Sequence, residues 1–367
     1  MKDPIIIVGA GLSGLRAASL LTSQGIECRV LEARSRIGGR VLSRAVEVSP
    51  EIGRFDLGPT WFWPDHEPVI SNLVTELGLQ TIIQHTDGAV LLEQSKNGPV
   101  QRHLLPEGAV QKSVRLVGGV QSLIEAVFAT LPSGVIELDT RVIGVSEDEE
   151  GRITVEAERS DGHLKKISAG AVIFALPPRI VAEHIDFSPA LPRELAASLK
   201  NKPTWMAGQA KVLAVYEHPF WREDGLSGQV MSWAGPLQEI HDASPETGHG
   251  AFFGFFGLSA ADRRELGEEK ILELVVRQLE RLFGPAAAKP ISLLYKDWSS
   301  DAETAVEEDL QPLNSFPDYG LPVKSGTWEK KIIFAGTETS PEFGGHLEGA
   351  LRSAERAVDE VKKLIRP

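Results

Sequence analysis

The first 32 residues alternate between short hydrophobic runs and a helical pattern. Residues Ile5–Val8 form an uninterrupted apolar run, which is typical of a strand buried on both faces. Apolar residues then recur at helical spacing over 12–24, and a second apolar run predicts a strand over 28–32. This order predicts a β-α-β unit, in which two parallel strands are joined by a right-handed crossover.

Further along, the pattern predicts a mixture of helices and strands. We expect helices over 68–79, 116–131, 268–282 and 347–364, and strands over 142–146, 153–157, 164–167, 171–175, 210–216 and 332–335. The last strand and helix are separated by a glycine-rich loop, as the first strand and helix are. We therefore expect both ends of the chain to contribute to one domain.

A glycine motif, Gly9-Ala10-Gly11-Leu12-Ser13-Gly14, lies between the first predicted strand and helix. The first glycine permits a tight turn, the second lets the backbone approach a pyrophosphate, and the third brings helix and strand together. Glu32 ends the second strand, where a carboxylate accepts hydrogen bonds from ribose hydroxyls and repels a 2′-phosphate. The motif therefore predicts a bound dinucleotide, either NAD or FAD.

The segment after Glu32 separates these two cofactors. It reads Ala33-Arg34-Ser35-Arg36-Ile37-Gly38-Gly39-Arg40, with two adjacent glycines and three arginines. Cationic residues directly beyond a ribose-binding acid favour the more extended FAD, and a solvated basic turn is the alternative.

At this point the sequence resembles a known family, the flavin-containing monoamine oxidases, which include polyamine and L-amino-acid oxidases. The resemblance is carried by "GAGLSG" with "LEARSRIGGR", and by "FAGTETSPEFGGHLEGALRSAERA" near the end. It is weaker in "VIFALPP", "AKVLAVYEHPFW" and "KDWSSD", and nearly absent over 66–115 and 225–290. It implies an FAD-dependent amine oxidase that moves a hydride from the α-carbon of an amine to flavin N5. This transfer would leave an imine, which hydrolyses to an aldehyde, and reoxidation of the flavin by dioxygen would give hydrogen peroxide.

The resemblance also implies roles in cofactor binding. Arg40 would contact the phosphates or the flavin edge, Val142 the adenine through its backbone, and Glu338 the ribityl chain or pyrophosphate. Leu347 would offer its N–H to the flavin C2 carbonyl, because a helix N-terminus stabilises negative charge there. The full predicted cofactor set is Gly9, Gly11, Leu12, Ser13, Gly14, Glu32, Ala33, Arg34, Gly39, Arg40, Gly58, Pro59, Thr60, Val142, Gly336, Glu338, His346 and Leu347.

Three residues are candidates for catalysis. Lys211 interrupts an apolar strand, so it either reaches solvent or has a function. The resemblance favours function, because the family places a lysine here that bonds through water to flavin N5 and assists the reaction with dioxygen. Trp298 matches a tryptophan near the flavin, with core packing as the alternative.

His346 is the third candidate and a departure from the family. Many members enclose the amine between two aromatic rings, one of them a tyrosine or tryptophan at the position of His346. An imidazole can still stack there, and it can also bond or titrate. We interpret His346 as catalytic, with a purely structural histidine as the alternative.

Two further departures narrow the chemistry. The stretch 310–320, where some members carry a flavin-attaching cysteine, has none, so FAD should be non-covalent. Where amino-acid oxidases carry an arginine after Gly58-Pro59, this chain has Trp61-Phe62-Trp63, which argues against a free amino acid as substrate. These aromatic residues either line the substrate pocket or pack a domain junction.

Taken together, these patterns predict an α/β fold with two domains. A Rossmann-like FAD-binding domain with a parallel sheet would comprise 1–65, 116–185 and 300–367. A smaller substrate domain with a mixed sheet and helices would comprise 66–115 and 186–299.

Composition excludes several other classes. A net charge of −13 disfavours nucleic acid and anionic membranes. The single cysteine, Cys28, excludes an intrachain disulfide, and no pattern predicts a metal. No signal peptide or membrane span is predicted, so we expect a cytoplasmic enzyme acting on a small molecule, with dioxygen as electron acceptor. The alternatives are a flavoprotein desaturase or oxidase for a non-amine substrate, or an inactive flavin-binding scaffold.

Overall fold

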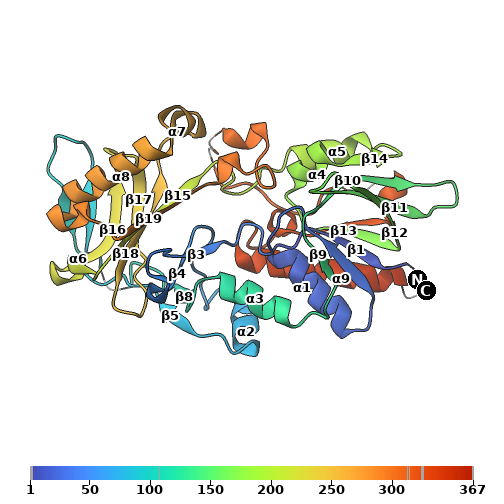
Figure 1. Ribbon diagram of the computed structural model, residues 1–367, viewed down its shortest axis with the longest axis horizontal. Coiled ribbons are helices and arrows are strands. Elements are labelled where there is room, and N and C mark those ends of the chain that lie inside the picture. Colours follow the sequence, from blue (N-terminus) through green and yellow to red (C-terminus); the bar gives the residue numbers. More distant parts are fainter. Residues whose placement is uncertain (1–2, 107, 312, 314, 324–325, 366–367) are drawn as a thin grey trace.

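A five-stranded parallel sheet organises one end of the molecule, shown on the right in Figure 1. The computed structural model describes residues 3–365 except 107, 312, 314, 324 and 325. The strand order is β20-β13-β1-β2-β9, so the sheet combines early, middle and late parts of the chain. Its strands are β1 (Ile5–Val8), β2 (Cys28–Leu31), β9 (Ile136–Glu137), β13 (Ala171–Phe174) and β20 (Ile332–Phe334).

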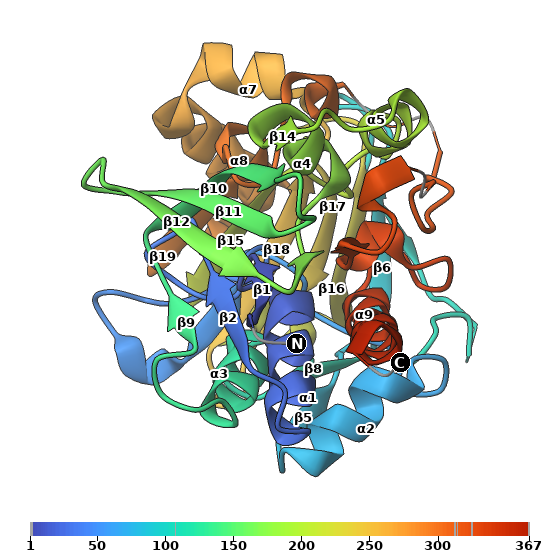
Figure 2. The ribbon, with the colours of Figure 1, turned by 90° about the vertical axis from the view of Figure 1, so that its right-hand side faces the viewer.

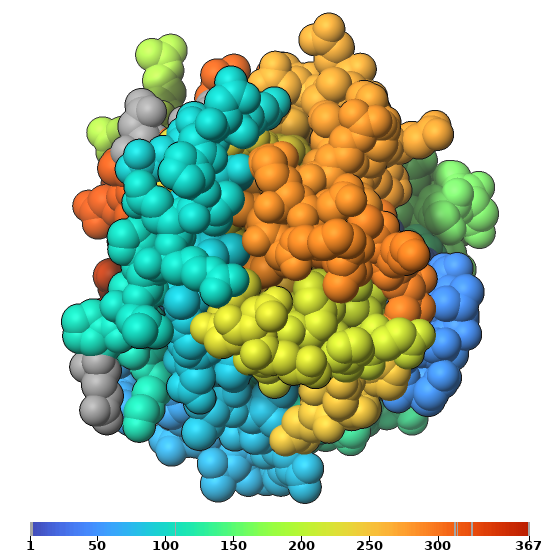
Figure 3. Space-filling model, turned by 90° about the vertical axis from the view of Figure 1, so that its left-hand side faces the viewer, coloured from blue at the N-terminus to red at the C-terminus, as the bar shows by residue number. Residues whose placement is uncertain are grey.

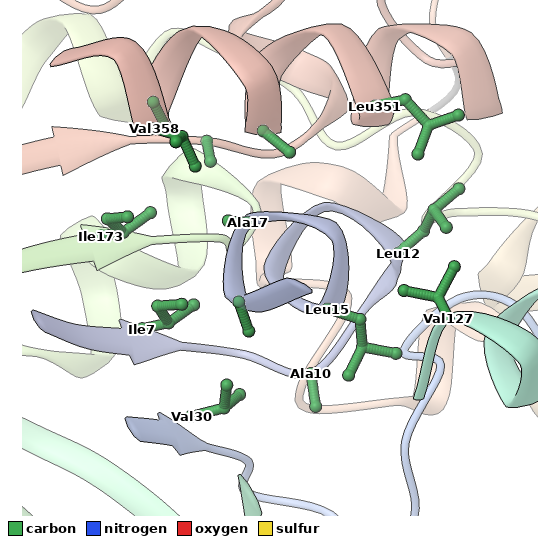
Figure 4. Close-up of a cluster of buried hydrophobic side chains, with 14 of the residues drawn as sticks. Ile7, Ala10, Leu12, Leu15, Ala17, Val30, Val127, Ile173, Leu351 and Val358 are labelled. Carbon is green, nitrogen blue, oxygen red and sulfur yellow. The ribbon is translucent and has the colours of Figure 1, made fainter. Parts of the chain in front are cut away.

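Alternating residues of these strands enter two different cores. Ile5 and Ile7 pack against helices on one face, whereas Ile6 and Val8 pack on the opposite face. Figure 4 shows the helical side, where Leu12 faces Leu351 and Leu15 lies near Val127. The helices are α1 (Leu12–Ser23), α2 (Pro68–Glu76), α3 (Gln121–Ala129) and α9 (Leu347–Ile365). The uninterrupted apolar runs of the strands follow from this double burial.

A second sheet covers the other face of the parallel sheet (Figure 2). Its order is β12-β11-β10-β14, and two short helices follow in the same region. These elements are β10 (Thr140–Glu147), β11 (Ile153–Arg159), β12 (Leu164–Ala169), β14 (Asp186–Ser188), α4 (Pro178–His184) and α5 (Arg193–Lys200). The parallel sheet is therefore enclosed between helices and this second sheet.

A seven-stranded mixed sheet forms the opposite end of the molecule, in the order β19-β15-β18-β17-β16-β6-β7. Helix α8 covers it, and in Figure 3 this helix (orange) lies beside the segment that contains β6 and β7 (cyan). Arg281 of α8 fixes this contact, because its Nε donates to Glu93 of β6 at 2.6 Å. The elements are β6 (Ala89–Glu93), β7 (Gln101–His103), β15 (Ala210–Tyr216), β16 (Leu226–Ser232), β17 (Leu237–Asp242), β18 (Gly250–Phe256), β19 (Ser292–Asp297), α6 (Phe220–Glu223), α7 (Ala260–Leu266) and α8 (Glu268–Phe283).

Short elements connect these layers. Two short antiparallel strand pairs lie between the large sheets. They are β3 (Ser43–Ala45) with β4 (Arg54–Asp56), and β5 (Thr81–Ile83) with β8 (Val114–Leu116). Single turns of 3₁₀ helix occur at Pro50–Ile52, Pro285–Ala288, Trp298–Ser300, Glu307–Leu310, Gly326–Trp328 and Thr337–Thr339. Among the described residues, no helix has both the length and the apolar character needed to cross a membrane.

The predicted α/β fold class and the initial β-α-β unit are confirmed, since β1 and β2 are parallel neighbours. One element was predicted wrongly, because residues 114–116 form strand β8 and α3 begins only at Gln121. Gly118 and Gly119 separate the two with φ of +79° and +78°, a conformation that interrupts a helix. The division into two domains stays a prediction. Helix α2, from a predicted substrate segment, packs against α9.

Candidate active site

A cavity of about 560 Å³ lies where the parallel sheet, the mixed sheet and their connecting loops meet. Most of the predicted site residues line it, although they are distant in sequence. These are Gly9, Gly11, Leu12, Ser13, Glu32, Arg34, Gly39, Arg40, Gly58, Pro59, Thr60, Lys211, Trp298, Gly336, His346 and Leu347. Gly14, Ala33, Val142 and Glu338 do not line this cavity.

The glycine motif forms a cradle at the N-terminus of α1. Gly9 has a φ of +101°, and a Cβ on Gly14 would lie 1.9 Å from the Gly9 carbonyl oxygen, so both positions require glycine. The first N–H groups of α1 have no partner within the helix and open onto the cavity beside Leu12 and Ser13. This cradle fits a pyrophosphate, because backbone N–H groups and the helix dipole both favour an anion.

Ser13 joins the cradle to the C-terminal part of the chain. Its Oγ accepts a hydrogen bond from the backbone N–H of Gly336 at 3.0 Å and lies 3.0 Å from Ser353 Oγ on α9. Leu347, the first residue of α9, also lines the cavity. Two helix N-termini, those of α1 and α9, therefore reach one site.

Glu32 is buried at the end of β2, with 3% of its surface exposed. Its carboxylate accepts hydrogen bonds from the backbone N–H of Ala10 at 2.7 Å and of Arg34 at 2.9 Å. Ala33 and Val142 line a small adjoining recess, which also includes Glu32. These bonds fix the carboxylate at the end of β2, the position at which this kind of fold binds a ribose.

The arginines after Glu32 differ in their surroundings. Arg34 lines the cavity and pairs with Asp301, whereas Arg36 donates to backbone carbonyls of its own loop and does not reach the cavity. Arg40 lines the cavity, and its guanidinium makes two hydrogen bonds, of 2.6 and 2.9 Å, to the fully buried carboxylate of Glu338. Arg40 is thus the member of this pair that lines the cavity, and the buried Glu338 fixes the position of its guanidinium.

Lys211 is buried on β15, with 2% of its surface exposed, which rules out the solvent-facing alternative. Its Nζ donates to the Gly58 carbonyl at 3.0 Å and to the hydroxyl of Thr60, and it lies 4.1 Å from the centre of the Phe253 ring. Burial lowers the pKa of Lys211 to about 7, while nearby Asp56 acts in the opposite direction. The cavity wall therefore carries an amine that changes its charge near neutral pH.

Aromatic rings make up much of the remaining wall. Trp298 is 6% exposed, donates to the Leu57 carbonyl at 2.9 Å and still lines the cavity. Trp61 and Trp63 line it too, whereas Phe62 between them is buried in the core under the parallel sheet. The structure thus assigns the two tryptophans to the pocket and the phenylalanine to packing.

His346 lines the cavity with its ring against Trp63, at 5.6 Å between ring centres and 34° between planes. Its Nδ1 lies 2.8 Å from Oε1 of Glu67, a residue that is 1% exposed. Sequence reasoning missed Glu67. It lies in a short polar stretch, and its partner is 279 positions away.

Other cavity residues were also missed, mainly because they lie where the resemblance fades. They are Trp205, Met206, Gln209, Met231, Gln238, Glu239, Phe253, Phe255, Phe256, Glu303 and Thr304. The alternating aromatic pattern of 250–256 was a signal for strand β18 that could have been used. Hydrogen bonding from His241 lowers the pKa of Glu239, so this cavity residue carries a negative charge near neutral pH.

The single cysteine does not reach the cavity. Cys28 is buried in β2 against the helical side of the parallel sheet, and burial raises its pKa to about 11. A neutral, enclosed thiol is a poor nucleophile, so the cysteine cannot attach a flavin. No other cysteine occurs in the sequence, so FAD would be bound non-covalently, and the cradle, Glu32 and Arg40 are the residues that fit it.

Comparison with known proteins agrees with this geometry. The family described as flavin containing amine oxidoreductase matches residues 88–362, and an NAD(P)-binding Rossmann-like domain matches residues 7–77. Putrescine oxidase of Kocuria rosea is 26% identical over 486 aligned residues, covering 98% of this chain and 95% of its own. Since the alignment is longer than the chain, the relative carries segments that have no counterpart here.

Solved structures show the same fold. A structure of putrescine oxidase with bound putrescine has a TM-score of 0.81 at 23% identity, covering 98% of this chain and 99% of its own. Cyclohexylamine oxidase from Brevibacterium oxydans has a TM-score of 0.79 at 20% identity, covering 99% and 100%. The family match spans well over half of the chain and includes Lys211, Trp298 and His346. The chain therefore belongs to the flavin-containing amine oxidoreductase family and is an FAD-dependent oxidoreductase.

Proposed function

We propose that the protein oxidises an amine at its α-carbon and passes the electrons to dioxygen, giving hydrogen peroxide and an imine that hydrolyses to an aldehyde. The observation that carries this proposal is the buried Lys211, with a pKa of about 7, in a cavity walled by Trp61, Trp63 and Trp298. When bound, FAD supplies the redox chemistry by accepting a hydride at N5 and returning the electrons to dioxygen.

The residues of the chain position the amine and control its protonation. The aromatic walls exclude water and disfavour the charged ammonium, so the substrate nitrogen keeps its lone pair free. Lys211 can hold a proton at Nζ near the site where dioxygen is reduced, and its hydrogen bonds to Gly58 and Thr60 fix its position. Its protonated form would stabilise negative charge that develops on oxygen.

A negatively charged side chain of the cavity wall favours a second positive charge on the substrate. Glu239 is negatively charged near neutral pH and lines the cavity beside Gln238. A diamine such as putrescine, the substrate in the name of one relative, would place its distal ammonium at Glu239. The family match disfavours a non-amine substrate and an inactive scaffold.

We further propose that the chain works as two domains, with FAD held by 1–65, 116–185 and 300–367 and the substrate by 66–115 and 186–299. Support comes from the sheets, each of which draws its strands mainly from one of these sets. We also propose a cytoplasmic location, and the charge of −13 disfavours binding to nucleic acid and anionic membranes.

The test is anaerobic addition of putrescine, butylamine and cyclohexylamine to the purified yellow protein. We expect loss of the oxidised flavin absorbance with at least one amine, with putrescine faster than butylamine, and peroxide when air is admitted. If dithionite bleaches the flavin and no amine does, the proposed function is wrong.

The role of Lys211 is tested by the rate at which the reduced protein reacts with dioxygen. We expect Lys211→Met to slow this step roughly 100-fold, the size of effect seen when one charge-stabilising group is removed. Lys166→Met is the control, because Lys166 lies on strand β12 and its side chain is 70% exposed. Equal rates in the two variants would remove the role given to Lys211.

A further inference from the structure

A buried carboxylate, Glu67, stands behind the cavity wall and contacts one side chain that lines it. Glu67 lies at the start of α2, is 1% exposed, and uses both carboxylate oxygens. Oε2 accepts a hydrogen bond from the backbone N–H of Trp63 at 2.7 Å, and Oε1 lies 2.8 Å from His346 Nδ1. Glu67 therefore joins the loop that carries Trp63 to the loop that precedes α9.

This contact determines which ring nitrogen of His346 carries a hydrogen. An ionised carboxylate only accepts hydrogen bonds, so Nδ1 must be the donor. Nε2 then remains unprotonated in the neutral ring, and it has no protein partner in the described part of the chain. Since His346 lines the cavity, Nε2 is the nitrogen left to meet a ligand.

The charged groups around His346 leave Glu67 as its sole ionic partner among the described residues. On α9, Glu348 forms an ion pair with Arg352 and accepts hydrogen bonds from backbone N–H groups of α2. Arg352 also forms an ion pair with Glu342. The neighbouring Asp65 and His66 are exposed. Arg40 is bound to Glu338, and the remaining ionisable residues of the cavity wall are Glu32, Arg34, Lys211, Glu239 and Glu303. A positive charge on His346 would thus be balanced by Glu67.

We propose that Glu67 and His346 form a proton-accepting pair for the incoming substrate. This inference rests on the proposed function, because an amine with an ordinary basicity of about 10.4 arrives as an ammonium ion at neutral pH. One N–H bond of the ammonium breaks, its electron pair stays on the amine nitrogen, and the proton moves to His346 Nε2 and from there to solvent, which the partly exposed ring can reach. Glu67 stabilises the resulting imidazolium, as a buried acid does for a histidine base.

Lys211 is less suited to this task. Its Nζ already donates to Gly58 and Thr60 and lies over the Phe253 ring, so its position is fixed away from solvent. His346 is about one third exposed and lies on the accessible side of the cavity wall. The two groups therefore have different roles: His346 accepts the proton of the substrate, and Lys211 assists the reaction with dioxygen.

The first test reads the protonation of His346 directly, without turnover. The holoenzyme is labelled with ¹⁵N-histidine, and the His346 signals are assigned by their loss in His346→Gln or their change in Glu67→Gln. In the free holoenzyme we expect hydrogen on Nδ1, the nitrogen that faces Glu67. Saturating tert-butylamine, which has no α-hydrogen to lose, should shift the Nε2 signal, because this nitrogen then accepts a hydrogen bond from the ligand. Tetramethylammonium, of similar size but without an N–H, should not.

Either of two results would overturn the proposal: hydrogen on Nε2 in the free holoenzyme, or an Nε2 signal that tert-butylamine leaves unchanged. The two ligands are compared on the unchanged protein, and the variants serve only to assign the signals, so one folded variant is sufficient. The comparison also stands if no amine reduces the flavin, which would refute the proposed function alone.

The second test is the rate of anaerobic flavin reduction by putrescine. We expect Glu67→Gln and His346→Gln to lose roughly 100-fold at pH 8, the usual contribution of a general base. At pH 10 the solution supplies more neutral amine, so most of this loss should disappear. Glu342→Gln, which removes an exposed carboxylate near the same loop, is the control. An equal loss at both pH values would mean that the pair is structural and would refute proton transfer.

Discussion

Replacing Lys211 with methionine should change the stability of the protein in opposite directions at low and high pH. Burial lowers the pKa of Lys211 from 10.5 to about 7. At 1.36 kcal/mol for each unit of pKa, this fall corresponds to about 5 kcal/mol. Between these two pH values the unfolded chain binds a proton at Lys211 that the folded protein does not. The wild type therefore loses about 1.4 kcal/mol of stability for each unit by which the pH falls, until the loss is complete near pH 7.

Lys211→Met removes this loss and also removes two hydrogen bonds, to Gly58 and Thr60, worth about 1 kcal/mol each. The variant should therefore be more stable than the wild type by about 3 kcal/mol at pH 7. It should be less stable by about 2 kcal/mol at pH 10.5, with the two curves crossing near about pH 9. A buried lysine that is functionally needed thus has a measurable cost in stability.

The assay is urea unfolding followed by circular dichroism at several pH values from 7 to 10.5, with saturating FAD throughout. Lys166→Met is the control, because Lys166 also lies on a strand but its side chain is 70% exposed. Its difference from the wild type should not depend on pH. If the curves for Lys211→Met and the wild type run parallel, the pKa argument for Lys211 is wrong.

Three other predictions follow from the same structure. Asp56→Asn should lower the pKa of Lys211 further, because Asp56 acts against the effect of burial; titration of the ¹³Cε-lysine NMR signal would show this, and an unchanged midpoint would contradict it. Gly14→Ala should yield protein without bound FAD, because the added Cβ meets the Gly9 carbonyl at 1.9 Å. Gly320→Ala, where the added atom meets nothing within 4 Å, should keep its yellow colour. Cys28, with its raised pKa of about 11, should react with iodoacetamide at pH 8 only after unfolding, and acid precipitation should release all the flavin into solution.

The parts of the site that the sequence predicted are those whose residues act within a short segment. Gly9, Gly11 and Gly14 share one turn, and Glu32 follows one helix later, so their joint function is visible in the spacing. Lys211 was recognisable because a lysine in an apolar strand contradicts the local pattern. In each case the physical signal lies within a few residues.

The parts that escaped prediction depend on contacts between distant segments. Arg40 and Glu338 were both selected, but nothing local shows that they bind each other across 298 positions. Glu67 gave no signal at all, because an acid in a polar stretch is ordinary until the fold brings His346 to it. The boundary of α3 was misplaced because the apolar residues of β8 continue into its helical pattern.

The strand order of the parallel sheet has a consequence for synthesis of the protein on the ribosome. Strand β1 pairs with β13, and β13 pairs with β20. Helix α1 packs against α9, which is synthesised more than 300 residues later. During translation the glycine motif therefore leaves the ribosome long before Gly336 is available to bind Ser13. A nascent or truncated chain would expose the apolar faces of β1 and α1 to chaperones and proteases. Acquisition of the yellow cofactor therefore requires that translation has passed α9, and it can serve as a reporter of that event.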